Sequence, residues 1–78
     1  MEHNKTEFEI FTHNVAWLRK HYSISKKQMA EILGIGIGSL NKIEQGQIPP
    51  RLRVDIIFAV YKHFGIHPSA QFSQWLQD

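Results

Sequence analysis

The chain contains no cysteine. Disulfide bonds and thiolate metal sites are therefore excluded, and packing alone must stabilise the fold. The 78 residues are enough for one modest hydrophobic core, but not for a core and a separate catalytic module. Without cysteine, a nucleophile motif or room for a substrate cleft, the sequence offers no catalytic arrangement. We expect a single domain that is not an enzyme.

Long hydrophobic runs are also missing. No segment approaches the roughly 18 apolar residues that span a bilayer, and the first seven residues carry no apolar stretch that could serve as a signal sequence. We therefore expect no membrane contact and a soluble, cytoplasmic protein. Hydrophobic residues make up 42% of the chain and charged residues 21%, which is typical of a folded domain. Flexibility is expected mainly in residues 1–6, which leaves residues 7–78 as the domain.

A large excess of one charge is lacking too. Nine Lys and Arg stand against seven Asp and Glu, and the net charge of +2 permits nucleic-acid binding without requiring it. The one pair of histidines four residues apart, His63 and His67, spans Gly65, where a helix should end, so we expect no metal site. The glycine-rich segment 34–39 follows a helix and lacks the Gly-Lys-Ser/Thr ending of a phosphate-binding loop. We expect no cofactor.

Apolar residues recur at helical spacing through most of the chain. In residues 7–22 they occur every three or four positions, at Phe8, Phe11, Val15, Leu18 and Tyr22. The same pattern predicts helices at residues 26–33, 37–45 and from about 50 to 64. Pro68 suits a first helical position, and Phe72, Trp75 and Leu76 mark a short fifth helix. No segment alternates like a strand, so the fold class is all-α with five helices.

Capping residues support two short helices joined by a tight turn. Ser25 is a good N-cap for the second helix, and Gln28 completes a capping box. Gly34 provides a stop after that helix, and Gly46 ends the next one. Two prolines, Pro49 and Pro50, then favour an extended connector. This arrangement is a helix-turn-helix by spacing, although many helical proteins contain such a corner without binding DNA.

The pattern resembles the Cro and lambda-repressor-like (Xre-type) helix-turn-helix family over roughly residues 11–72. The residues that carry the resemblance are Leu18-Arg19, Ile24-Ser25, Met29-Ala30, Leu33-Gly34, Leu40, Ile43-Glu44, Gly46 and Pro49. The resemblance implies a five-helix lambda-repressor-like domain with its motif at about residues 25–45 and double-stranded DNA as its partner. It also implies an ion pair between Arg19 and Glu44 that fixes the third helix.

Membership in such a family would place the second helix of the motif in the major groove. The implied base contacts are Ile37, Gly38, Ser39, Asn41, Lys42 and, more peripherally, Gln45. Asn41 could pair with adenine and Lys42 with guanine acceptors or a phosphate. Family members usually carry polar or basic residues at positions 37 and 38, so base readout could shift toward thymine methyl contacts and DNA shape. Ile37 could equally pack against protein.

Phosphate contacts are expected around the same face. The candidates are Lys26, Lys27, Gln47, Arg51 and Arg53. Lys26 stands where the family very often has glutamine, so we expect a bond that supports the recognition helix to be replaced by charge attraction to phosphate. Any single lysine is more commonly a solvated surface residue. The prediction of phosphate contacts therefore depends on the clustering of these candidates on one face.

The family also favours homodimers that place two recognition helices one DNA turn apart. We expect Phe72 in the core and Trp75 and Leu76 at a dimer contact. The alternative function is a protein-interaction module that keeps the helix-turn-helix scaffold with weak or no DNA binding. Exposed apolar surface outside the dimer face would favour that alternative.

Overall fold

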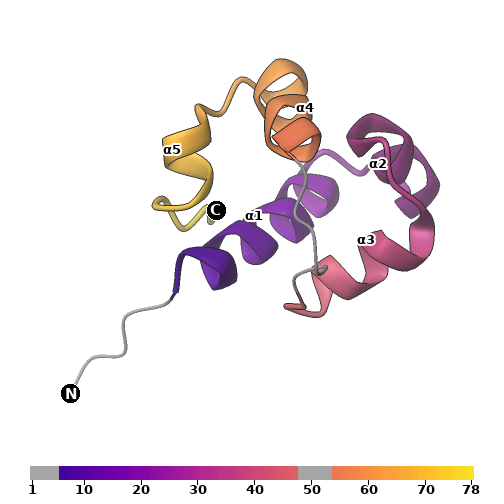
Figure 1. Cartoon of the computed structure of the whole chain (residues 1–78), viewed down its shortest axis with the longest axis horizontal. Coiled ribbons are helices and arrows are strands. Elements are labelled where there is room, and N and C mark those ends of the chain that lie inside the picture. Colours follow the sequence, from indigo (N-terminus) through magenta and orange to yellow (C-terminus); the bar gives the residue numbers. More distant parts are fainter. Residues whose placement is uncertain (1–5, 48–53) are drawn as a thin grey trace.

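The longest helix, α1 (Glu7–His21), runs through the middle of the domain, with the other helices arranged around it (Figure 1). The computed structural model describes residues 6–47 and 54–78, and within these ranges all regular structure is helical. The other helices are α2 (Lys26–Leu33), α3 (Ile37–Glu44), α4 (Val54–Phe64) and α5 (Pro68–Gln71). α1 packs against α3 and α5, and α2 packs against α3 and α4. The prediction of an all-α, five-helix fold is confirmed.

The N-terminus of α1 is fixed by a capping box. The Thr6 hydroxyl accepts the Glu9 amide hydrogen at 3.1 Å, and the Glu9 carboxylate accepts the Thr6 amide hydrogen at 2.7 Å. Each side chain thus satisfies an amide that the first turn of a helix leaves without a partner. Thr6 is thus the N-cap of α1, whereas the sequence prediction assigns residue 6 to the flexible end. Residues 1–5 lie outside the described ranges.

The hydrophobic core collects apolar residues from α1, α2, α3 and α4. Its buried members are Phe11, Val15, Leu18, Met29, Ala30, Leu33, Leu40, Ile43, Ile56 and Val60. Phe8 and Tyr22, at the two ends of the predicted α1 stripe, are instead 51% and 56% exposed. Phe72, expected in the core, is half-buried, and its ring stacks on Phe11 with centroids 4.8 Å apart.

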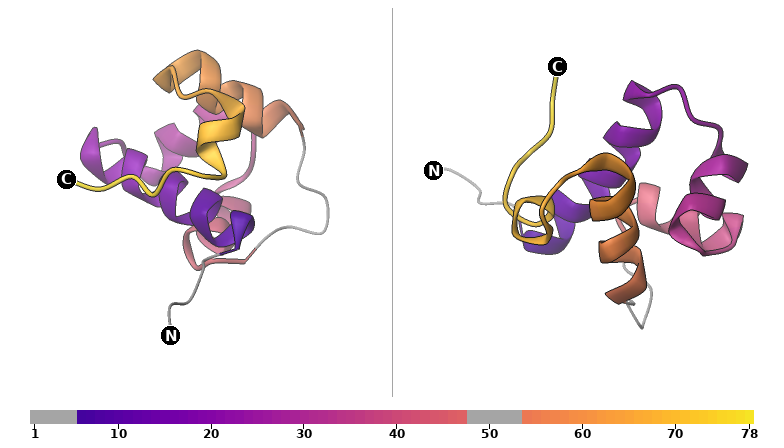
Figure 2. Two further views of the ribbon diagram at one scale, coloured as in Figure 1. Left: turned by 90° about the vertical axis from the view of Figure 1, so that its left-hand side faces the viewer. Right: turned by 90° about the horizontal axis from the view of Figure 1, so that it is seen from above.

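The fifth helix is shorter than its apolar spacing predicts. α5 ends at Gln71, and Trp75 and Leu76 lie in a non-helical segment that runs along α1 (Figure 2). The buried side chain of Asn14 donates to the backbone oxygens of Gln71 and Gln74, at 2.9 and 2.7 Å. These oxygens find their partner on α1, so the chain gains more from lying against that helix than from adding another helical turn. The predicted continuation of the helix through Leu76 is therefore wrong.

Two predictions concern residues outside the described ranges. The extended Pro49-Pro50 connector and the start of the fourth helix at about residue 50 both fall within residues 48–53. The described part of α4 begins at Val54 and continues to Phe64, which is the predicted end. Gly65 follows with a φ of 74°, the left-handed conformation expected of a glycine just past a helix.

Candidate nucleic-acid interface

Two capped ends set the turn between α2 and α3. At the start of α2 the Ser25 hydroxyl accepts the Gln28 amide hydrogen at 3.1 Å, and the Gln28 side-chain oxygen accepts the Ser25 amide hydrogen at 3.3 Å. At its end, Gly34 has a φ of 72°, which glycine adopts without the penalty that a Cβ brings. Both predicted caps of α2 are confirmed. α3 begins three residues beyond Gly34, with Gly36 as its N-cap.

The inner face of α3 is fixed in the core. Leu40 and Ile43, three residues apart, are both fully buried. They meet a core to which α2 contributes Met29 and Ala30. Because α3 has only 8 residues, packing of this face rather than intrinsic helix propensity must hold it in place. The opposite face is consequently held in a fixed orientation toward solvent.

That outer face carries the residues implied as base contacts. Ile37, Gly38, Ser39, Lys42 and Gln45 are exposed, whereas Asn41 is half-buried. The Ile37 side chain is 45% exposed, so nearly half of its surface is available to a partner. Around Gly38, an added Cβ would meet no atom within 4 Å. The start of α3 therefore combines one accessible aliphatic side chain with an open stretch of backbone.

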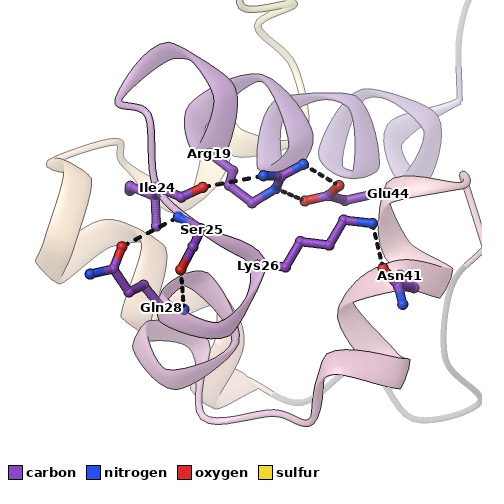
Figure 3. Close-up of polar contacts among 7 residues, drawn as sticks. All are labelled: Arg19, Ile24, Ser25, Lys26, Gln28, Asn41 and Glu44. Carbon is purple, nitrogen blue, oxygen red and sulfur yellow. Dashed lines mark hydrogen bonds and ion pairs between the residues drawn. The ribbon is translucent and has the colours of Figure 1, made fainter.

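Lys26 and Asn41 join the two helices of the motif through their side chains (Figure 3). The Lys26 ammonium donates to Asn41 Oδ1 at 2.7 Å. Sequence reasoning assigned Lys26 to phosphate and Asn41 to a base, and it expected charge attraction to replace a supporting bond at Lys26. The structure instead contains a bond from Lys26 to α3. The sequence spacing gave no signal for this contact, because the two residues are 15 positions apart on different helices.

Arg19 of α1 and Glu44 of α3 form a two-point ion pair (Figure 3). Arg19 Nε donates to Glu44 Oε2 at 2.5 Å, and Nη2 donates to Oε1 at 3.0 Å. A third donor, Nη1, reaches the Ile24 backbone oxygen at 3.2 Å, in the loop before α2. The side chains of the pair are only 16% and 10% exposed. One guanidinium thus connects the end of α1, the entry to α2 and the end of α3.

The environment of Arg19 favours its charged form. The hydrogen bond to Glu44 is the largest cause and raises the pKa of Arg19 above its ordinary value. Burial acts in the opposite direction, and the negative charge of Glu44 adds to the increase. Arg19 therefore stays charged at any pH at which the protein would be handled, so the last turn of α3 keeps a permanent cation beside its carboxylate.

The predicted phosphate contacts are only partly within the described ranges. Lys26 and Lys27 are exposed in the first turn of α2, which contains no acidic residue. Gln47 is exposed just after α3, and its backbone amide donates to the Lys42 backbone oxygen at 2.8 Å. Arg51 and Arg53 lie among residues 48–53, so the structure does not place them. The described candidates therefore lie at the start of α2 and just beyond the end of α3.

The predicted dimer residues lie away from α3, against α1. The Trp75 indole stacks on the His13 ring with centroids 3.4 Å apart, yet Trp75 remains 40% exposed. Leu76 is half-buried, and its backbone oxygen accepts a hydrogen bond from His13 Nε2 at 2.7 Å. Because a carbonyl oxygen can only accept, Nε2 is the protonated nitrogen. Trp75 thus presents an accessible aromatic surface, while much of Leu76 packs within its own domain.

No cluster of three or more His, Asp or Glu side chains suited to a metal ion occurs in residues 6–47 and 54–78. In the same part of the chain, no helix has both the length and the apolar character needed to cross a bilayer.

Comparison with known families identifies the motif. The sequence model of a helix-turn-helix family matches residues 15–70, which include α2, the turn and α3. The chain belongs to the Cro- and C1-type helix-turn-helix family. This family consists of DNA-binding regulators and is not typically enzymatic. No curated protein and no solved structure matches the chain.

Proposed function

We propose that this helix-turn-helix protein is a sequence-specific DNA-binding transcriptional regulator that reads the major groove with α3. The observation that carries the proposal is the two-sided character of α3. Its inner side chains, Leu40 and Ile43, are fully buried, while Ile37, Ser39 and Lys42 point to solvent. An α-helix fits the major groove, and a helix fixed from behind can hold its outer side chains at the edges of bases.

The exposed side chains of α3 suit different features of base pairs. Lys42 can donate to guanine O6 and N7, Ser39 can bond several base edges, and Ile37 can contact a thymine methyl group. Gly38 allows the backbone to approach the DNA closely, because it has no side chain. Gln45 at the C-cap of α3 is placed for a peripheral contact. We assign Asn41 to base recognition as well.

Phosphate contacts would set the orientation of α3. Lys26 and Lys27 stand at the N-terminus of α2, where helical amides and two positive charges favour an anion. Gln47 offers a side-chain donor beyond the end of α3. We assign Arg51 and Arg53 to phosphate contact as well. Contacts of this kind add affinity without base preference, and they make binding sensitive to salt.

The regulatory outcome that we propose is repression. Occupation of a promoter by a small domain is sufficient to block transcription, whereas activation requires an additional favourable contact with the polymerase. We further propose a homodimer formed through Trp75 and Leu76, which would place two copies of α3 about 34 Å apart, one turn of DNA. Cytoplasmic localisation is part of the same proposal.

A second function is favoured by a different surface. Val54, Phe58 and Tyr61 recur at helical spacing on α4 and are 59%, 52% and 44% exposed. Beside them, Ile32 and Ala59 line a shallow groove between α2 and α4. An exposed apolar stripe of this kind is typical of a protein interface. The alternative is therefore a protein-interaction module in which α4 contacts the partner and DNA binding is weak.

Selection of binding sites from a random duplex library tests the proposed function. The full chain would be used at about 50 mM and 200 mM salt, where phosphate contacts make a measurable difference. The Asn41→Ala/Lys42→Ala variant removes two outward side chains of α3, and Lys62→Ala removes an exposed lysine of α4 as a matched control. We expect an enriched motif that the α3 variant loses and the control keeps.

The two candidate functions give different results. A palindromic motif supports a dimeric reader of DNA sequence. Salt-sensitive binding without enrichment contradicts sequence-specific recognition and leaves only phosphate contact. Absence of binding at the lower salt concentration contradicts the DNA-binding function and favours the interaction module, whose surface would then be tested by substitution of Phe58.

A further inference from the structure

The bond between Lys26 and Asn41 determines which hydrogen-bonding groups Asn41 can offer. An asparagine side chain has one acceptor oxygen and one NH2 group with two donors. The Lys26 ammonium has donors only, so a bond at 2.7 Å must use the oxygen of Asn41. Figure 3 shows the amide nitrogen of Asn41 on the side away from Lys26. The outward group is consequently a donor.

We propose that Asn41, oriented by Lys26, is a specificity-determining residue that recognises the acceptor edge of a guanine in the major groove. This inference rests on the proposed DNA-binding function. It differs from the adenine contact that the sequence of α3 implies for an isolated asparagine. Guanine presents two acceptors, N7 and O6, where adenine presents N7 beside an N6 amino donor.

An adenine contact would need Asn41 Oδ1 to accept a second hydrogen bond beside the one that it accepts from Lys26. Asparagine pairs with adenine by donating to N7 and accepting from N6. In this protein a positive charge sits on one side of Oδ1 and repels the partial positive charge of an approaching amino group. Guanine brings no amino group to this position, because its N7 and O6 atoms in the major groove are both acceptors. Lys42, the next residue along α3, is exposed and has only donors. It therefore also favours the acceptor edge of guanine.

The position of Asn41 suits this role. Its side chain is half-buried, so fewer rotamers are open to it than to the fully exposed side chains around it. Lys26 lies in the first turn of α2, and its ammonium keeps two hydrogens for other acceptors. The bond therefore joins Asn41, proposed to contact a base, to Lys26, proposed to contact a phosphate. It couples the orientation of the Asn41 amide to the position of the Lys26 ammonium.

A change at Lys26 tests the proposal through base preference. In Lys26→Met the ammonium is lost while the aliphatic stem remains, and Asn41 Oδ1 becomes available. The full chain and this variant would each be used in the duplex selection at low salt. We expect a guanine position in the wild-type motif that becomes adenine in the variant, with a change in relative preference of roughly tenfold, as for one base contact.

Lys27→Met is the matched control. Lys27 is the neighbouring exposed lysine and is also assigned to phosphate, so its loss should weaken binding to all sequences and leave the preferred base unchanged. A preference for adenine in the wild type, or the same preferred base in Lys26→Met and wild type, overturns the proposal. Circular dichroism of each variant verifies that the fold is retained.

The free protein provides an independent readout. The side-chain amide resonances of Asn41 should shift in Lys26→Met and stay unchanged in Lys27→Met, without any DNA present. Unchanged resonances in both variants show that the bond is absent and overturn the inference even if DNA is bound. Shifted resonances together with no binding to any duplex overturn the proposed function instead, and the base preference with it.

Discussion

Arg19 meets Glu44 through two parallel hydrogen bonds, so each oxygen of the carboxylate has its own nitrogen donor. This bidentate geometry is the strongest form of a carboxylate-guanidinium pair, and here it is mostly shielded from water. The pair connects the ends of α1 and α3, which are 25 residues apart in sequence. It therefore fixes the C-terminal end of α3, while Leu40 and Ile43 fix its inner face.

Glu44→Ala is expected to lower the free energy of unfolding by about 3 kcal/mol, because it leaves the Arg19 guanidinium without its counter-ion in a partly buried position. Urea denaturation followed by circular dichroism measures the change. Glu31→Ala removes an exposed carboxylate of α2 and should alter stability by less than about 0.5 kcal/mol. A double-mutant cycle of Arg19→Ala with Glu44→Ala that yields no coupling would contradict the structural role of the pair.

Asn14→Ala should release the C-terminal segment from α1. Asn14 uses both side-chain hydrogens on the oxygens of Gln71 and Gln74, and its oxygen accepts the Leu76 amide hydrogen at 3.0 Å. Loss of these bonds should cost about 1–3 kcal/mol of stability. Hydrogen exchange provides the local readout, because the Leu76 amide should lose its protection.

Asn14→Asp is a sharper version of the same test. A carboxylate has nearly the shape of the amide but cannot donate to the two backbone oxygens, so it should be no more stable than the alanine variant. Gln77→Ala, in the same segment and exposed, is the control and should leave both stability and exchange unchanged. Because the carboxylate can still accept the Leu76 amide hydrogen, full protection of Leu76 in Asn14→Asp would show that the two bonds donated to Gln71 and Gln74 are not needed to hold the segment.

Two glycines of the motif should respond to alanine with opposite signs. Gly38 lies in the first turn of α3 with open space around it, so Gly38→Ala should raise stability by about 0.5–1 kcal/mol through the lower entropy of the unfolded chain. Gly34 has a left-handed backbone, so Gly34→Ala should lower stability by about 1 kcal/mol. Thermal denaturation compares the two, and an equal shift in both would contradict the assignment.

The two exposed apolar surfaces predict different effects on assembly. If Trp75 forms the dimer contact, Trp75→Ala should lower the solution mass to that of a monomer, as measured by analytical ultracentrifugation. Phe58→Ser, on the α4 stripe, should then leave the mass unchanged. The reverse result would place the contact between copies on α4. An unchanged mass in both variants would exclude both surfaces as the dimer contact.

The sequence predicted those features of the fold that depend on local rules. The limits of α2, its capping box and its glycine stop follow from residues within a few positions of one another. The end of α4 at Phe64 and the buried face of α3 follow from periodicity in the same way. The Thr6 and Glu9 capping box is equally readable as a Thr-x-x-Glu motif, which identifies residue 6 as the N-cap of the first helix.

The remaining features depend on contacts between distant residues, which periodicity cannot reveal. The apolar spacing of Phe72, Trp75 and Leu76 fits a helix, but the polar side chain of Asn14 on another helix decides the conformation there. Within the candidate site, exposure of single residues of α3 followed from its pattern, whereas the bond from Lys26 to Asn41 required the crossing of two helices. The hydrogen-bonding groups that Asn41 leaves available depend on that crossing.

The attachment of the C-terminal segment to α1 also bears on how the protein folds during synthesis. Asn14 is synthesised 62 residues before its partner Leu76, so its side chain can bond only to water while α2, α3 and α4 emerge. The helix-turn-helix can form from local contacts in that interval, but α1 can pack against the C-terminal segment only after Leu76 has been synthesised. During translation, the face of α1 that carries Phe11 and Asn14 therefore lacks its C-terminal cover until the segment after α5 is made.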